Sequence, residues 1–163
     1  MTRAAELGAQ YATTEEILEQ PSPLAERLGQ LCEHLVRHVA HYTMVAIYVP
    51  HRERPGVLAL AAAAGRRPFP DVVPGGAGPW SEAADRGETA LAQRLAGSCD
   101  GSARRWVGAQ LAAPLLSNGL RLGIVAVDSS RRAPFHADDE LFVENLGDLI
   151  AMRLALAGVG GRG

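Results

Sequence analysis

The stretch 121-RLGIVAVDSSRRAPFHADDELFVENLGDLIAMRL-154 decides the fold expected for this chain. Its first part is apolar and rich in β-branched residues, which favours a buried strand. Its last part predicts an amphipathic helix from about Ala137 to Leu156, since apolar residues recur there at helical spacing. Three acids, Asp138, Asp139 and Glu140, fill the first turn, where carboxylates interact favourably with the positive end of the helix dipole.

Two hairpins are expected upstream of that helix. The segment 109-AQLAAPLLSNG-119 predicts the partner of the first strand, because an Asn-Gly step between apolar runs is typical of a tight hairpin turn. An earlier hairpin would pair 44-MVAIYVP-50 with 56-GVLALAAAAG-65 across HRERPG. The alanines at 61–64 favour helix by propensity, but the shortness of the run and its flanking glycines favour a strand.

The remaining helices are expected closer to the N-terminus and in the middle of the chain. Leucines at helical spacing predict an amphipathic helix over residues 23 to about 41, with Ser22 as its N-cap. Thr13 and Glu16 match a capping box, so the arm before it can form a short helix. Residues 65–80 are expected to form a loop, and 81–97 two short helical pieces that begin at Ser81 and are divided by Gly87.

Together these elements predict one α+β domain, an antiparallel sheet with helices packed against it. The expected organisation is an N-terminal arm at 1–21, the domain at 22–157 and a flexible tail at 158–163. At 163 residues with a net charge of -2, the chain offers no basic surface for nucleic acid. It also lacks a signal peptide or a membrane-spanning run, so a cytoplasmic protein with reduced Cys32 and Cys99 is expected.

Over positions 24–156 the chain resembles the GAF family of sensory domains. The resemblance is carried by GAGPWSEAADRGE, by AQLAAPLLSNGLRLGIVAVDSS and by PFHADDELFVENLGDLIAMRL, in that order. It implies an antiparallel sheet of five or six strands, with the N- and C-terminal helices on one face and a loop-covered ligand pocket on the other. Members bind cyclic nucleotides, bilins, haem, amino acids, nitrate or nothing known, so the fold does not identify a ligand or a cofactor.

By this resemblance, a pocket would use eight polar and aromatic residues. Two tryptophans near arginines could form an apolar slot with an anion-binding fork. In the alternative interpretation the tryptophans cover the core and the arginines are solvated. The eight residues are Tyr48, Phe69, Trp80, Arg104, Arg105, Trp106, Gln110 and Asp128.

Three further groups of residues each allow two interpretations. His34, His38 and His41 fall on one arc of the first predicted helix, as a partial metal site or, more simply, as a solvated flank or dimer contact. Asp128 with its following serines could bind a ligand, although such residues more often cap a turn.

Cys99 is the third case, because GAF-type free methionine-(R)-sulfoxide reductases resemble this chain and carry their catalytic cysteine in a Cys-Asp pair. Such an enzyme also needs a second thiol to resolve the sulfenic acid. The subfamily's partner cysteines lie in the glycine-rich segment, where this chain has none, and Ala126 stands where the subfamily has an extra Asp. Cys32 is expected in the core. An incidental exposed thiol is therefore the favoured interpretation of Cys99.

The leading functional hypothesis is a GAF-type sensory domain that binds a small molecule of unknown identity. Its terminal helices would pass the signal to a partner protein, and their broad apolar surfaces favour a homodimer through a helical bundle. The alternatives are a sulfoxide reductase that uses Cys99 and a ligandless dimerisation module.

Overall fold

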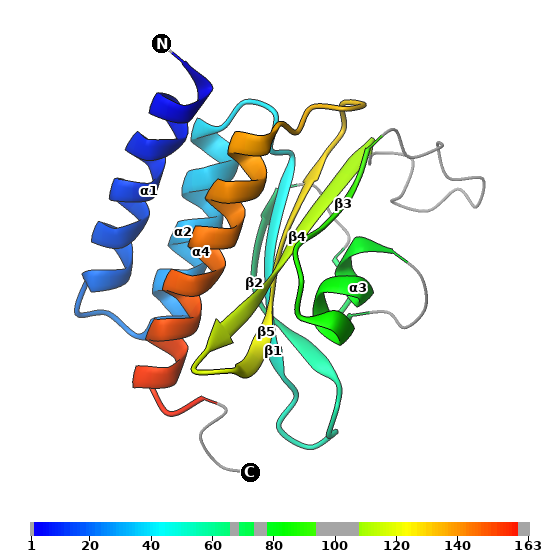
Figure 1. The fold of residues 1–163 in the computed structure, drawn as a ribbon. Coiled ribbons are helices and arrows are strands. Elements are labelled where there is room, and N and C mark those ends of the chain that lie inside the picture. Colours follow the sequence, from blue (N-terminus) through cyan, green and yellow to red (C-terminus); the bar gives the residue numbers. More distant parts are fainter. Residues whose placement is uncertain (1, 66–68, 74–77, 94–107, 160–163) are drawn as a thin grey trace.

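A computed structural model describes residues 2–65, 69–73, 78–93 and 108–159 of the chain (Figure 1). The order of elements is α1 (Arg3–Glu19), α2 (Leu24–His38), β1 (Met44–Pro50), β2 (Leu58–Gly65), α3 (Pro79–Arg86), β3 (Ala90–Ala92), β4 (Ala109–Ser117), β5 (Leu120–Ser129) and α4 (Ala137–Leu156).

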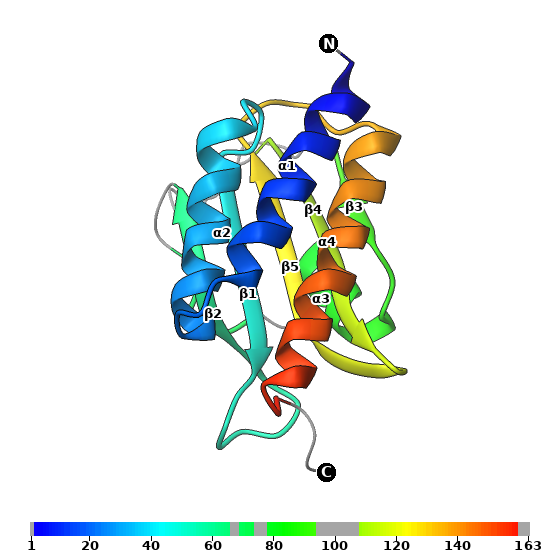
Figure 2. The same ribbon diagram turned by 90° about the vertical axis from the view of Figure 1, so that its left-hand side faces the viewer.

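The five strands form one antiparallel sheet in the order β2-β1-β5-β4-β3. Helices α2 and α4 pack on one face of this sheet, and α3 lies on the other (Figure 1). Helix α1 forms an additional outer layer, because it packs on α2 and α4 (Figure 2). The predicted α+β architecture is confirmed, and it leaves two different apolar layers, one on each face of the sheet.

Both predicted hairpins are present. Asn118 and Gly119 have φ values of 50° and 79°, the positive pair that a type I′ turn needs. The alanine run of β2 is a strand, since Ala62 pairs with Ile47 and Ala64 with Val45 in β1. Burial and an available partner strand outweigh the helix propensity of alanine here.

The larger core lies between the sheet and the helices. Residues of α4 are buried on more than one side, among them Phe142, Leu146 and Ile150. One side packs on β4, and another packs on α1, where the rings of Tyr11 and Phe142 meet edge to face at 6.5 Å. The broad apolar surface of the last helix, from which a dimer interface was expected, is thus largely covered from within the chain.

The N-terminal helices begin at other residues than predicted. Helix α1 starts after Thr2, whose side chain accepts a hydrogen bond from Ala5 N, so Thr13 and Glu16 lie inside a 17-residue helix. Helix α2 is preceded by Pro23 as its N-cap, without a side-chain cap from Ser22, and it ends at His38. The N-terminal segment was expected to be an arm with at most a short helix. It is instead a complete helix that packs on α2 and α4.

The predicted pair of short helices at 81–97 is only half correct. Helix α3 starts one turn earlier, after Gly78, and it ends at Gly87, whose left-handed conformation closes the helix. The second piece is not a helix, because Ala90–Ala92 forms β3 on the open edge of β4. A free sheet edge supplies hydrogen-bond partners that a three-residue helix would lack. Residues 94–97 lie outside the described part of the chain.

In the part of the chain that the structure describes, no helix is long and apolar enough to cross a membrane.

Candidate functional site

The polar centre of the α3 face is Asp128, near the end of β5. Strand register places it beside Gln110 of β4 and Met44 of β1. Gln110 Nε2 donates to Oδ2 of Asp128 at 3.4 Å, and the indole Nε1 of Trp80 donates to Oδ1 at 3.3 Å. Both distances are long for hydrogen bonds to a carboxylate, so each donor holds it weakly.

Helix α3 carries Trp80 over the sheet. Gly78 precedes the helix with a φ of 135°, a conformation that favours glycine, and Pro79 occupies the first turn, where its missing N–H costs nothing. At the other end, the guanidinium of Arg121 donates to the carbonyl oxygens of Ala84 at 3.4 Å and of Asp85. A cation on the last carbonyls of a helix is favourable. Arg121 therefore fixes α3 to the start of β5, a role that the sequence pattern did not indicate.

Two aromatic residues form the wall beside Trp80. Tyr48 of β1 is fully buried, and its ring centroid lies 5.4 Å from that of Trp80 at 51°. The Tyr48 hydroxyl donates to the Pro70 carbonyl at 2.8 Å, which fastens the segment 69–73 to the sheet. Phe69 is half-buried and packs against the same apolar cluster. Tyr48 therefore acts as a wall and a tether, with its hydroxyl already paired.

The floor of the site is made of small residues. Ala46, Ala126 and Ala112 are direct neighbours across β1, β5 and β4, one row from the row of Asp128. All three are buried, and they belong to the cluster that α3 covers through Ala83. Methyl side chains leave the sheet surface low at this point, directly beside the carboxylate.

Burial dominates the electrostatics of Asp128. Asp128 is only 2 % exposed to solvent. Burial raises the pKa of Asp128 from 3.8 to about 7, although the hydrogen bonds from Gln110 and Trp80 lower it in part. Burial, together with the nearby charge of Asp128, also raises the pKa of Tyr48. Within the described residues, no arginine or histidine forms an ion pair with Asp128.

The structure thus brings together five of the eight predicted pocket residues, Tyr48, Phe69, Trp80, Gln110 and Asp128. Arg104, Arg105 and Trp106, like Cys99, lie outside the described residues. The alternative that Asp128 and its following serines cap the next turn is confirmed for Ser129, whose hydroxyl accepts a hydrogen bond from Arg131 N at 3.2 Å. The oxygens of Asp128 accept from Trp80 and Gln110 instead.

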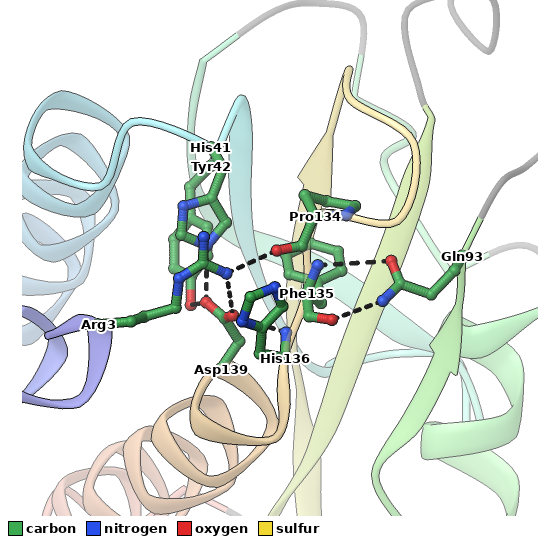
Figure 3. A network of polar contacts seen from close by, with 8 residues as sticks. All are labelled: Arg3, His41, Tyr42, Gln93, Pro134, Phe135, His136 and Asp139. Atoms are coloured by element: carbon green, nitrogen blue, oxygen red, sulfur yellow. Dashed lines mark hydrogen bonds and ion pairs between the residues drawn. The ribbon is translucent and has the colours of Figure 1, made fainter.

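A second polar centre, which the sequence did not indicate, lies at the N-terminal end of α4. Asp139 is fully buried and accepts hydrogen bonds from four donors: Arg3, His41, Tyr42 and the backbone N–H of His136 (Figure 3). Asp139 was predicted as one of three acids that interact with the helix dipole. Its position as third residue after the cap His136, with the pattern of a capping box, was the available signal.

His34, His38 and His41 were predicted to lie together, but they do not form one group. His34 and His38 stack with their ring centroids 4.2 Å apart, and His34 Nε2 lies 2.5 Å from Gln10 Oε1. His41 lies beyond the end of α2, where it is buried against Asp139. Among the residues the structure describes, no three His, Cys, Asp or Glu side chains are placed to hold a metal ion.

Cys32 belongs to the core, as predicted. It is fully buried on α2, which lies on the face of the sheet opposite α3, and burial raises the pKa of its thiol to about 12. A buried thiol with a raised pKa is a poor nucleophile.

An open hollow of about 420 Å³ also lies at the end of α2, and its lining residue Thr43 donates its backbone N–H to the Asp128 carbonyl at 2.8 Å. It has no buried charged side chain in its lining, and we assign no function to it. The lining residues are Val36, Ala40, Tyr42, Thr43, Gly65, Ser130 and Arg131.

Comparison with known proteins identifies the family. Residues 21–155 match the GAF domain, so the chain belongs to the GAF domain family. No match was found among curated protein sequences.

Solved structures with the same fold include free methionine-R-sulfoxide reductases and GAF domains of other proteins. The free methionine-R-sulfoxide reductase from Neisseria meningitidis, solved with its substrate, is 20% identical over 97% of this chain and 93% of its own, with a TM-score of 0.78. The corresponding protein of Staphylococcus aureus with substrate is 16% identical over 91% and 95%, with a TM-score of 0.76. The GAF domain of a phosphoenolpyruvate-protein phosphotransferase from Coxiella burnetii is 17% identical over 96% and 97%, with a TM-score of 0.75. At these identities the likeness establishes the fold and not an activity.

Proposed function

We propose that this chain is a GAF-type sensory domain that binds a small molecule between α3 and the sheet. The observation that carries the proposal is Asp128, a buried carboxylate held by two neutral donors at 3.3 and 3.4 Å. An ionised carboxylate without a cationic partner is costly to bury. A ligand that pairs with Asp128 would offset that cost, and such groups cluster at functional sites.

The surroundings of Asp128 suggest the chemistry of the ligand. A protonated amine or amidinium would supply the charge that Asp128 lacks among the described residues. Tyr48 and Trp80 place aromatic rings beside Asp128, and the buried residues Ala46, Ala112 and Ala126 make the adjoining sheet surface apolar, which suits a cation with an apolar or planar body. The three residues at 104–106 that were predicted to line the pocket stay predictions.

A reductase of the methionine sulfoxide type is the second candidate, favoured by the fold that this chain shares with such enzymes. The chemistry of the described residues argues against it. The sequence has two cysteines, and Cys32 is fully buried in the core with a raised thiol pKa, so it is a poor resolving thiol for a sulfenic acid. Ala126 also leaves Asp128 without a second carboxylate on the floor. If the unmodified protein has a reductase activity and the Cys99→Ser variant loses it, the reductase becomes the favoured candidate.

We propose further that the domain acts in the cytoplasm and passes its signal through the terminal helices to a partner protein, as a homodimer. With α1 covering much of α2 and α4, the apolar surface that remains on α4 is narrow and comprises Leu141, Met152 and Leu156. A dimer that uses it would be weak and dependent on concentration. Sedimentation that gives a monomer at all accessible concentrations would exclude both the homodimer and the ligandless dimerisation module.

Thermal-shift titration tests the proposed site. The probes are free amino acids, including methionine sulfoxide and arginine, each beside its N-acetyl derivative, at a pH of about 8, where Asp128 is ionised. We expect at least one free amine to raise the melting temperature while its N-acetyl form does not, and Asp128→Asn to abolish the shift. Equal shifts in the unmodified protein and in Asp128→Asn would show that any binding occurs elsewhere.

A further inference from the structure

The network around Asp139 joins three segments that are distant in sequence. Arg3 comes from the first residue of α1, His41 and Tyr42 follow α2, and Asp139 lies in the first turn of α4 (Figure 3). Arg3 Nη1 also donates to the Pro134 carbonyl at 2.6 Å. The N-terminal end of α1 is therefore attached both to α4 and to the segment that leads from β5 into α4.

The carboxylate of Asp139 is fully satisfied. Oδ1 accepts from His41 Nε2 at 2.7 Å and from the Tyr42 hydroxyl at 3.0 Å; Oδ2 accepts from Arg3 at 2.9 Å and from His136 N at 2.9 Å. Two acceptor positions per oxygen are thereby filled. Burial alone would raise its pKa, but the hydrogen bonds, with that of His41 foremost, lower the pKa to about 2. Asp139 therefore stays ionised and keeps all four donors in place.

Arg3 is the most solvent-accessible of the side chains that donate to Asp139. Its side chain is 29% exposed, whereas that of His41 is 8% exposed. A positive charge in the first turn of a helix opposes the helix dipole, so Arg3 does not stabilise α1 itself. Its contribution comes from Asp139 and Pro134, which fasten the helix to the domain. The rest of α1 contributes a single buried stripe, Leu7, Thr14 and Leu18.

Gln93 connects the segment of residues 134–136 to β3, the edge strand of the sheet. It follows β3 directly, and its side-chain amide holds the backbone of Phe135 on both sides, with Nε2 donating to the carbonyl at 2.6 Å and Oε1 accepting from N–H at 3.5 Å (Figure 3). Strand β3 contacts α3, the helix that carries Trp80. A continuous chain of contacts thus runs from α3 through β3, Gln93 and residues 134–136 to Arg3.

We propose that this chain is a conformational relay: Gln93 holds residues 134–136 in the position that lets Arg3 fasten α1, so displacement of β3 by α3 frees the N-terminal half of α1. The relay rests on the proposed function at one point, because ligand binding between α3 and the sheet is what would displace β3. The relay connects the α3 face to the outer helix α1, and a partner protein that contacts α1 would respond to the change. Contiguity alone does not establish coupling, so the coupling must be measured.

Hydrogen exchange followed by mass spectrometry on the full chain without ligand measures it. Arg3→Met should speed exchange in residues 4–12 of α1 about tenfold, the effect expected for one charge-assisted hydrogen bond. Gln93→Met removes no contact with α1, yet the relay requires the same amides to exchange at least about threefold faster. Gln30→Met, at an exposed position of α2, and Arg52→Met, in an exposed turn, are the matched controls and should leave α1 unchanged.

The double variant supplies the decisive comparison. If Gln93 acts through Arg3, then Arg3→Met with Gln93→Met exchanges no faster in α1 than Arg3→Met alone. Faster exchange confined to residues 130–136 in Gln93→Met, or effects of the two changes that simply multiply in α1, would overturn the relay. Because no ligand is present, either result leaves the amine titration of the α3 site independent.

Discussion

The Trp80 indole N–H lies 3.3 Å from Oδ1 of Asp128, and this contact joins helix α3 to the sheet at the centre of the candidate site. Both partners are placed by simple rules, Trp80 by a helix that opens with Gly-Pro and Asp128 by the alternation of β5. The contact is long for a bond to a carboxylate, so the same oxygen remains available to a stronger donor.

The buried carboxyl should make stability depend on pH. A pKa raised from 3.8 to about 7 in the folded protein means that the contribution of Asp128 is fully present below about 4 and is lost as the pH rises through 7. We expect the free energy of unfolding to fall by about 2.6 kcal/mol between pH 5 and 8, at about 1.4 kcal/mol for each pH unit below the folded-state pKa. Urea denaturation at several pH values measures this fall.

Asp128→Asn is the control for that dependence, since the amide keeps the shape without the charge. It should flatten the profile and make the protein more stable than the unmodified chain at pH 8. Asp139 does not interfere, because its lowered pKa places its own loss of stability near pH 2 to 4. Parallel profiles for the two proteins would mean that Asp128 is already paired with a cation.

Arg121 should control the position of α3. Arg121→Met removes the donors to the carbonyls of Ala84 and Asp85 and is expected to cost about 1 kcal/mol of unfolding free energy. The structural signature is local, with faster hydrogen exchange in residues 80–86 and a weakened Trp80 contact. Arg52→Met also removes an exposed arginine, but it should change neither the exchange of residues 80–86 nor the Trp80 contact. An effect of the same size in Arg52→Met would mean that the Arg121→Met result reflects only the loss of a positive charge.

Two glycines should respond to alanine in opposite directions. Gly123 has a φ of 129°, and a Cβ there would lie 1.8 Å from the Tyr48 carbonyl oxygen, so Gly123→Ala should separate β5 from β1 and cost more than about 3 kcal/mol. Gly8 in α1 has nothing within 4 Å of such a Cβ, and Gly8→Ala should gain up to about 1 kcal/mol. Thermal unfolding of both variants checks the signs; a destabilised Gly8→Ala would mean that α1 is not the helix described.

Cys32 should be inert in the folded protein. In Cys99→Ser, the remaining thiol is buried with a pKa of about 12, so a disulfide reagent at pH 8 should react only after unfolding. Rapid reaction in native buffer would restore Cys32 as a candidate resolving thiol and with it the reductase hypothesis.

The sequence predicted the sheet well because its signals are local. Asn118-Gly119 fixes a turn, and the pattern of β5 fixes which side chains share a face. The segment after Gly87 was mispredicted because the open edge of β4, distant in sequence, converted Ala90–Ala92 to a strand. The same holds for Thr13 and Glu16, which matched a capping box inside a longer helix that tertiary contacts stabilise.

The candidate site was predictable only in part. Asp128, Gln110 and Tyr48 follow from the GAF resemblance. The roles of Arg121 and Asp139 do not, since each depends on a contact with a segment far away in the chain. His41 illustrates the limit: helical spacing grouped it with His34, but α2 ends first and turns it towards Asp139.

Binding of a small molecule to the α3 face through Asp128 can be measured by native mass spectrometry of the protein isolated gently from the cells that make it, beside Asp128→Asn isolated in the same way. We expect a retained small molecule with a basic nitrogen on the unmodified protein and the bare chain mass for the variant. A bare chain mass for the unmodified protein, or an equal adduct on both proteins, would rule out this mode of binding.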